Sequence, residues 1–385
     1  RPVNPPGISI AAETPLWVDS SDSWHLTQQL DEYTHTIRAL GGYWSARFTV
    51  GGNRHLMDDW LQDGLGRHIE VFDGSLTKIW EGFVDKILVS YGPLAVERGP
   101  LLDTANSVAI NYSAITYDEN DEPVVGTRET SDYEDDTDSQ ALWGIIPKIL
   151  STGGIQTASA ESVRDSFLRE NAAPETSKTW RSTSAGSETN VTVECLGYVH
   201  WLNWAFNDLT SGGYDADEKI LAVLADTPNS TWLTYGTDHV DENTLDVESW
   251  ENQNNLAWSV IKDTVAHGGT SNERWIFGIY ENRDAYYQAA PTTIEYQQRL
   301  SDTAVRLESV EGMEVYPWNI LPGKWIIYPD FLIGQAAEQD LRDDPRAMFI
   351  EEVKFTAPDQ LEMQGGKTGK LDAIIAKLGL RGIGA

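Results

Sequence analysis

The stretch His68-Ile-Glu-Val-Phe-Asp-Gly-Ser-Leu-Thr-Lys-Ile-Trp-Glu-Gly-Phe-Val-Asp-Lys-Ile-Leu-Val-Ser90 decides the fold of this chain. Its two strand-like runs, 68–73 and 78–90, meet at Asp73-Gly74-Ser75, a combination typical of a hairpin turn. Gly82 inside the second run predicts a bulge or sharp bend of the kind that small barrels need. We therefore expect an antiparallel hairpin within a β-rich, barrel-like domain.

Outward from this hairpin, strand and helix patterns alternate along all 385 residues, a length that predicts two or three units. Helices are expected over 55–63, 139–150, 159–171, 215–224 and 249–267. The predicted segments are an extended N-terminal arm (1–19), a β-barrel-like domain (20–117), an acidic loop with a mixed helical and strand insertion (118–248), an α/β segment (249–310), a second β-rich domain (311–366) and a C-terminal helix (367–385). The predicted fold class is α+β.

The charge of the chain excludes several partners. Sixty Asp and Glu against 28 Lys and Arg give a net charge of −32, which argues against a general nucleic-acid binder and against binding to anionic membranes. No apolar run approaches the ~20 residues that span a bilayer, so no stable membrane insertion is expected. Ten acids lie within 118–138, which predicts a solvated loop, whereas residues 354–385 carry a net charge of +2.

Motifs for chemistry are largely missing, and we expect no catalytic, cofactor-binding or metal-binding residues. The single cysteine, Cys195, excludes an intrachain disulfide, and its neighbour His200 makes a nucleophile pair conceivable, although a core position is favoured. Acids between Asp132 and Asp138 lack the spacing of an EF-hand loop. Gly365-Gly366-Lys367-Thr368 is half of a phosphate loop and is better interpreted as a turn.

Aromatic residues indicate packed interfaces. The chain has 15 Trp, and Tyr198, Trp201 and Trp204 concentrate in one short segment. That segment is either a sugar-stacking platform or, as we favour, core or subunit interface. The candidate interface residues are Tyr198, Trp201, Trp204, Lys367, Lys370 and Lys377.

Several stretches together resemble the tail hub (tail-tip or baseplate hub) proteins of tailed bacteriophages. The resemblance is carried by Gly64–Phe72 leading into Ile79–Ile87, by Gly99–Val108 with Tyr112-Ser113, by Trp143–Ile146 and Leu150–Gly154, by Arg274–Arg283, by Val315–Trp318 with Pro322-Gly323, and by Gln364–Lys367 with Leu371-Asp372 and Leu378–Leu380. These stretches follow one another over residues 40–385.

The resemblance implies a structural protein and not an enzyme. Hub proteins have two tube-like β-barrel domains with α/β insertions and form rings, usually trimers, at the distal end of the tail tube. Expected partners are further copies of the chain, the distal tail protein, the tape-measure protein and tip or fibre proteins. The expected location is the phage tail tip in the virion, after assembly in the host cytoplasm. An acidic channel would let genomic DNA pass without binding it.

Two alternatives stay open at this point. One is a distal tail or fibre-adaptor ring protein, which prefers six-fold rings. The other belongs to a different class, an extracellular carbohydrate-binding or carbohydrate-active protein. On the hub interpretation, the basic terminal helix with Leu371, Ile374, Ile375 and Leu378 docks on an acidic face of a neighbouring subunit, and deletion of 367–385 should weaken assembly.

Overall fold

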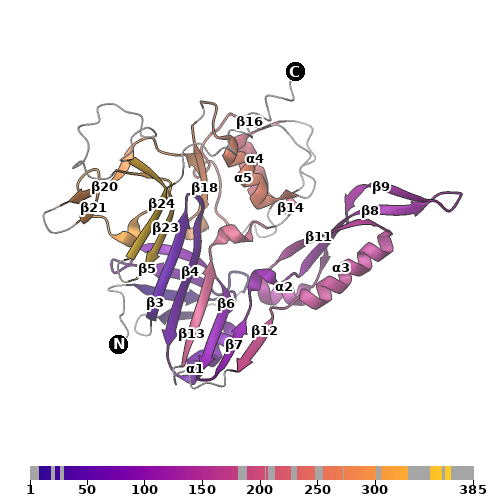
Figure 1. Ribbon diagram of the computed structural model, residues 1–385, viewed down its shortest axis with the longest axis horizontal. Coiled ribbons are helices and arrows are strands. Elements are labelled where there is room, and N and C mark those ends of the chain that lie inside the picture. Colours follow the sequence, from indigo (N-terminus) through magenta and orange to yellow (C-terminus); the bar gives the residue numbers. More distant parts are fainter. Residues whose placement is uncertain are drawn as a thin grey trace.

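The computed structural model describes residues 8–18, 22–26, 30–180, 189–203, 205–206, 213–226, 232–247, 255–271, 273–300, 305–327, 347–357 and 360–365. It is an α+β structure dominated by one large mixed sheet (Figure 1). The helices are α1 (Arg54–Asp63), α2 (Thr137–Trp143), α3 (Thr157–Asn171), α4 (Ala216–Ala225) and α5 (Ala257–His267), with short 3₁₀ turns η1 (Leu101–Asp103), η2 (Tyr198–Trp201), η4 (Glu281–Arg283) and η5 (Pro317–Asn319). Among the described residues, no helix is both long and apolar enough to cross a membrane.

The main sheet has 16 strands, of which 11 form a continuous path and five are side branches. In order, its strands are β2 (Ser23–Leu26), β1 (Ser9–Glu13), β5 (His68–Phe72), β6 (Lys78–Tyr91), β13 (Thr189–Leu196), β4 (Leu40–Gly51), β3 (Leu30–Arg38), β23 (Ala347–Thr356), β22 (Trp325–Ile327), β20 (Ile294–Leu300) and β21 (Val305–Ser309). The branches are β7 (Leu94–Arg98), β12 (Thr176–Trp180), β18 (Trp275–Ile279), β19 (Ala285–Ala289) and β24 (Gln360–Gly365). Within the described ranges no pairing joins β2 to β21, so the path is open.

The predicted hairpin is confirmed as β5 and β6, which pair from His68↔Phe83 to Phe72↔Lys78. The turn is built by Asp73, whose Oδ1 accepts hydrogen bonds from the backbone N–H groups of Ser75 and Thr77. Gly82 has a different role from the one expected. A Cβ there would lie 2.3 Å from the Leu196 carbonyl oxygen, so the glycine permits close backbone approach.

The bulge lies three residues further on, at Asp85. The β13–β6 register shifts between Glu194↔Lys86 and Cys195↔Val84, which leaves Asp85 without a paired residue. Its Oδ1 accepts a hydrogen bond from the N–H of Leu102 at 3.0 Å. Burial raises the pKa of Asp85 from 3.8 to about 6, against the opposing effect of this hydrogen bond.

Asp85→Asn should gain stability relative to the natural chain as the pH rises. The folded chain holds a proton on Asp85 up to about pH 6, whereas the unfolded chain releases it near pH 3.8, so this carboxyl contributes less stability as pH rises between those values. The variant keeps the acceptor for Leu102 and loses this dependence. Urea unfolding measures the free energy of unfolding of both chains at pH 4 and pH 7. From pH 4 to pH 7, the variant should gain about 1–3 kcal/mol in this free energy relative to the natural chain. A stability difference that does not change with pH would contradict it.

A second sheet forms a unit that projects to one side of the main sheet (Figure 1). Its strands are β8 (Ser107–Tyr117), β9 (Pro123–Thr130), β10 (Glu134–Asp135) and β11 (Pro147–Ile155), and α3 packs on one face through Ala160 and Leu168. Two small ribbons complete the topology, β14 (Ala205–Phe206) with β17 (Asn255–Leu256), and β15 (Tyr214–Asp215) with β16 (Asp246–Val247).

Three predicted segments differ from the structure. The N-terminal arm is wrong in part, because residues 9–13 form β1, whose buried Ile10 and Ala12 belong to the core. The acidic loop instead contains β9 and the start of α2, since β8 supplies a pairing edge that the local sequence cannot reveal. The helix predicted over 139–150 ends at Trp143, where Gly144 takes φ 73°, and residues 147–155 pair with β8.

The other helices agree with expectation within a few residues. Helices α1, α3 and α4 fall on the predicted ranges, and Asp215 closes a capping box at the start of α4. Helix α5 begins at Ala257, later than predicted; residues 249–254 lie outside the described residues. The predicted C-terminal helix over 367–385 also lies outside them.

Candidate functional site

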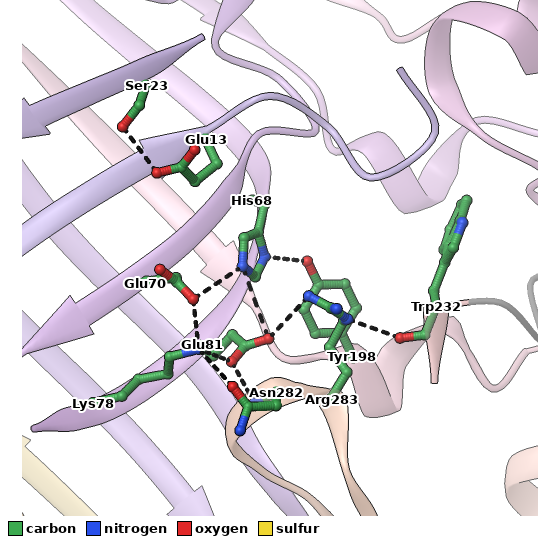
Figure 2. Close-up of polar contacts among 10 residues, drawn as sticks. All are labelled: Glu13, Ser23, His68, Glu70, Lys78, Glu81, Tyr198, Trp232, Asn282 and Arg283. Carbon is green, nitrogen blue, oxygen red and sulfur yellow. Dashed lines mark hydrogen bonds and ion pairs between the residues drawn. The ribbon is translucent and has the colours of Figure 1, made fainter. Parts of the chain in front are cut away.

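A buried network of charged side chains lies on the β5–β6 hairpin (Figure 2). Its centre is Glu81 on β6, whose side chain is fully buried. Lys78 Nζ bridges the two carboxylates, 2.5 Å from Glu70 Oε1 and 2.7 Å from Glu81 Oε2. On the other side of Glu81, Arg283 lies 3.5 Å from Oε1. Two carboxylates therefore face two cations.

His68 completes the network. Its Nε2 lies 3.6 Å from Glu70 and 3.8 Å from Glu81, and a hydrogen bond of 2.6 Å joins its Nδ1 to the Tyr198 hydroxyl. Together, His68 and Lys78 hold the pKa of Glu70 at about 2, well below its ordinary 4.5. Burial alone would lower the pKa of Lys78, but its bonds to Glu70 and Glu81 raise it. The pairs thus compensate the cost of burying charge.

His68, Glu70 and Glu81 have the chemistry of a metal site, with ligand atoms all within 4.8 Å of one another. The geometry favours an ion-pair network instead. Lys78 already occupies the position between the two carboxylates, and Arg283 balances the second negative charge. A divalent cation would add two positive charges beside two cations in a buried site.

The network fastens distant parts of the chain to the hairpin. Glu81 Oε2 accepts the backbone N–H of Asn282 at 2.8 Å, and Arg283 Nε donates to the carbonyl of Trp232 at 2.8 Å. Asn282 and Arg283 have φ of 59° and 61°, a left-handed conformation that Asn tolerates but that is unfavourable for Arg. Contacts with Glu81 and Trp232 hold the turn in this conformation. The site is therefore a structural junction.

Local sequence patterns did not predict this network, although the hairpin contains part of the signal. The turn at Asp73 sets a register in which Glu70 directly opposes Glu81. Two facing carboxylates repel each other unless a cation lies between them, so the register indicates that a cation is needed there. Regular alternation would put Lys78, three residues before Glu81, on the opposite face of the strand. The register shift between Val71 and Phe72, which leaves Ile79 unpaired, brings Lys78 to the face of Glu81. Arg283 comes from a segment about 200 residues away, and no local pattern predicts its contact.

The predicted aromatic interface is corrected by the structure. Tyr198 and Trp201 are 3 % and 5 % exposed and belong to the main hydrophobic core. Trp201 packs its ring against Phe83, Trp17 and Trp232. Buried rings neither anchor a neighbouring subunit nor stack on a sugar, so for these two the core interpretation holds. Trp204, Lys367, Lys370 and Lys377 lie outside the described residues.

The remaining candidates also have structural roles. Cys195 is 1 % exposed, and burial raises its pKa well above the ordinary value, which disfavours the reactive thiolate. His200 packs on Trp44, and its Nε2 lies 3.1 Å from the Trp44 carbonyl oxygen. Within 132–138, Asp136 caps α2 through the N–H of Ser139. Glu134 pairs with Arg164 at 3.3 Å. These acids support helices α2 and α3.

Comparison with known proteins gives distant likenesses. No family model matches the chain, and no curated protein matches it. Among solved structures, the chain is similar to the tail protein from Neisseria meningitidis MC58 (7 % identity, TM-score 0.40, covering 92 % of this chain and 94 % of that one). It is also similar to the 43 kDa tail protein of prophage MuSo2 from Shewanella oneidensis (8 %, TM-score 0.40, 93 % and 95 %) and to prophage tail protein gp18 from Listeria monocytogenes EGD-e (8 %, TM-score 0.41, 97 % and 98 %). Likenesses at this level do not establish a family.

Proposed function

We propose that this chain is a structural protein of a phage tail, the hub that forms a ring at the distal end of the tail tube. The observation that carries the proposal is the hairpin of residues 64–90. It carries the first of the stretches that resemble tail hubs, and it forms β5 and β6, which lie inside the main sheet with β1 on one side and β13 on the other. This part of the resemblance thus lies in a hairpin that is paired on both sides within the main sheet.

The polar groups at this hairpin support a structural role. The charges of Glu70 and Glu81 are matched by Lys78 and Arg283, and the network connects strands to a turn. A tail component must withstand assembly and DNA ejection, and multiple buried ties between distant segments suit that task. The net charge of −32 suits a channel wall that DNA slides past without binding.

The proposed assembly is a homotrimeric ring in the virion. Its neighbours are the distal tail protein, the tape-measure protein and the tip or fibre proteins at the tail tip. It forms in the host cytoplasm before the virion is released. Genomic DNA crosses the ring transiently during ejection.

The purified chain should therefore form a three-fold ring. Light scattering coupled to size exclusion measures the mass, and class averages from electron microscopy show the symmetry. A trimeric mass with three-fold averages is the expected result. Six-fold averages would identify a distal tail or adaptor ring instead, and a stable monomer at micromolar concentration would contradict both ring functions.

A further inference from the structure

The hairpin of β8 and β9 leaves an apolar face uncovered. Packing of Ile110 and Tyr112 near Ala160 shows which face of β8 is covered by α3. Alternation along the strand therefore puts Ile115 and Tyr117 on the opposite face. Their partners in β9 are Val125 and Pro123.

The face of the ribbon that carries Ile115, Tyr117, Pro123 and Val125 is open to solvent. Tyr117 is 55 % exposed and Val125 is 62 % exposed. On the adjacent strand β11, Gly154 lies where a Cβ would touch Ile115 and Val125, so no side chain covers them at this position. Among the described residues, this face of the ribbon has no covering element. Exposed β-branched and aromatic side chains on a two-stranded ribbon are typical of a docking surface.

Charge surrounds the apolar face in two zones. At the turn, Asp118, Glu119, Asp121 and Glu122 are all exposed. Toward the base, Arg128 donates to Asn111 Oδ1 and Ser151 Oγ, which marks the polar end of the face. Because four acids crowd the turn, contact between the hairpins of two copies would bring like charges together. The partner must instead be basic as well as apolar.

One segment of the chain has this combination. Residues 366–385 carry Lys367, Lys370, Lys377 and Arg381 against Asp372 alone, a net charge of +3 in a chain of −32. Their sequence predicts an amphipathic helix with Leu371, Ile374, Ile375 and Leu378 on one side. We propose that residues 366–385 of one copy dock on the Ile115–Tyr117–Pro123–Val125 face of a second copy.

The location of the two elements indicates a contact between chains. The segment follows β24, which pairs with β23 in the main sheet, whereas the hairpin tip lies at the far end of the projecting unit (Figure 1). This arrangement favours the hairpin of a neighbouring copy in the ring as the contact, and the inference rests on the proposed ring.

Cross-linking tests the contact directly. Cys195 is buried, so engineered cysteines can be oxidised selectively. We expect a mixture of Val125→Cys chains and Ile374→Cys chains to form a disulfide-linked dimer, with residues 125 and 374 joined in peptide mass spectra. The matched control is Val163→Cys on α3, 47 % exposed on the other side of the same unit, which should not cross-link.

Charge reversal tests the electrostatic part. Glu119→Lys with Glu122→Lys should reduce the yield of the Val125–Ile374 cross-link about tenfold at low salt, and less at high salt. Glu161→Lys with Glu170→Lys makes the same charge change on exposed positions of α3 and should leave the yield unchanged. Asp118 is kept because it accepts the N–H groups of Asn120 and Glu122 in the turn.

Three results would overturn the inference. One is a Val125→Cys yield no higher than that of Val163→Cys. The second is a link that forms within single chains of a variant carrying both Val125→Cys and Ile374→Cys but not in the mixture of single-cysteine chains. The third is equal effects of the two charge reversals. Light scattering on the natural chain separates the two proposals. A ring without the cross-link rejects this contact and leaves the proposed function standing, whereas a monomer rejects both.

Discussion

Glu81→Gln should lower the free energy of unfolding by about 3–5 kcal/mol. The substitution keeps the size of the side chain and an oxygen for the Asn282 N–H, but it removes the negative charge. Lys78 and Arg283 then lose the carboxylate that lies 2.7 Å and 3.5 Å from them in a buried site. In the variant, Lys78 and Arg283 share only the Glu70 carboxylate, which leaves one buried positive charge unbalanced. In the natural chain the two carboxylates balance the two cations, so the folded natural chain is more stable. Urea unfolding monitored by Trp fluorescence measures the loss.

Glu97→Gln is the matched control. Glu97 pairs with Lys86 at 2.8 Å, but its side chain is 37 % exposed, so its removal should cost less than about 1 kcal/mol. Equal losses in the two variants would show that burial is not the source of the effect. A chelator distinguishes the ion-pair network from a metal centre, because only a metal-bound site would lose thermal stability on its addition.

Trp60→Ala should also cost about 3–5 kcal/mol, for a different reason. Trp60 is the anchor of α1, fully buried, with its ring 5.1 Å from that of Trp24 and 5.9 Å from that of Phe48. Its removal leaves a cavity between the helix and the sheet that the surrounding strands cannot close. The midpoint of urea unfolding measures the effect.

Trp60→Phe makes the cavity explanation testable. The indole Nε1 has no hydrogen-bond partner among the described residues, so the smaller ring loses volume but no hydrogen bond. The cost should be well below that of the alanine variant. Leu76→Ala, at a side chain 78 % exposed in the hairpin turn, should change stability by less than about 0.5 kcal/mol. A Phe variant as unstable as the Ala variant would contradict the cavity mechanism.

Local patterns predicted the elements that depend on nearby residues. The β5–β6 hairpin follows from Asp73-Gly74 between two strand-like runs, and the helix predicted over 215–224 is α4, whose first turn holds a capping box between Asp215 and Glu218. In both, the deciding contacts lie within a few residues of one another, so the signal is contained in a short window. The α+β class follows from the alternation of such windows.

Two predictions were wrong where a strand pairs with a partner that is distant in the sequence. Residues 147–150 continue a helical pattern, yet they form part of β11 because β8 offers a parallel edge about 40 residues earlier in the chain. Residues 123–130 lie within the acid-rich stretch 118–138, which indicates a loop when considered alone, but they pair with β8 as β9. The free energy of strand pairing comes from the partner strand, which no local window contains.

By itself, the sequence determined the central hairpin, most helices, the unequal distribution of charge and the single cysteine. Only the tertiary structure decided that Tyr198 and Trp201 are core residues and that Glu81 holds Lys78 and Arg283 together. Likewise, only the tertiary structure showed that one face of the β8–β9 ribbon is uncovered. Burial and charge pairing depend on which distant segments meet, and an aromatic or acidic residue has the same local pattern whether it is covered or exposed.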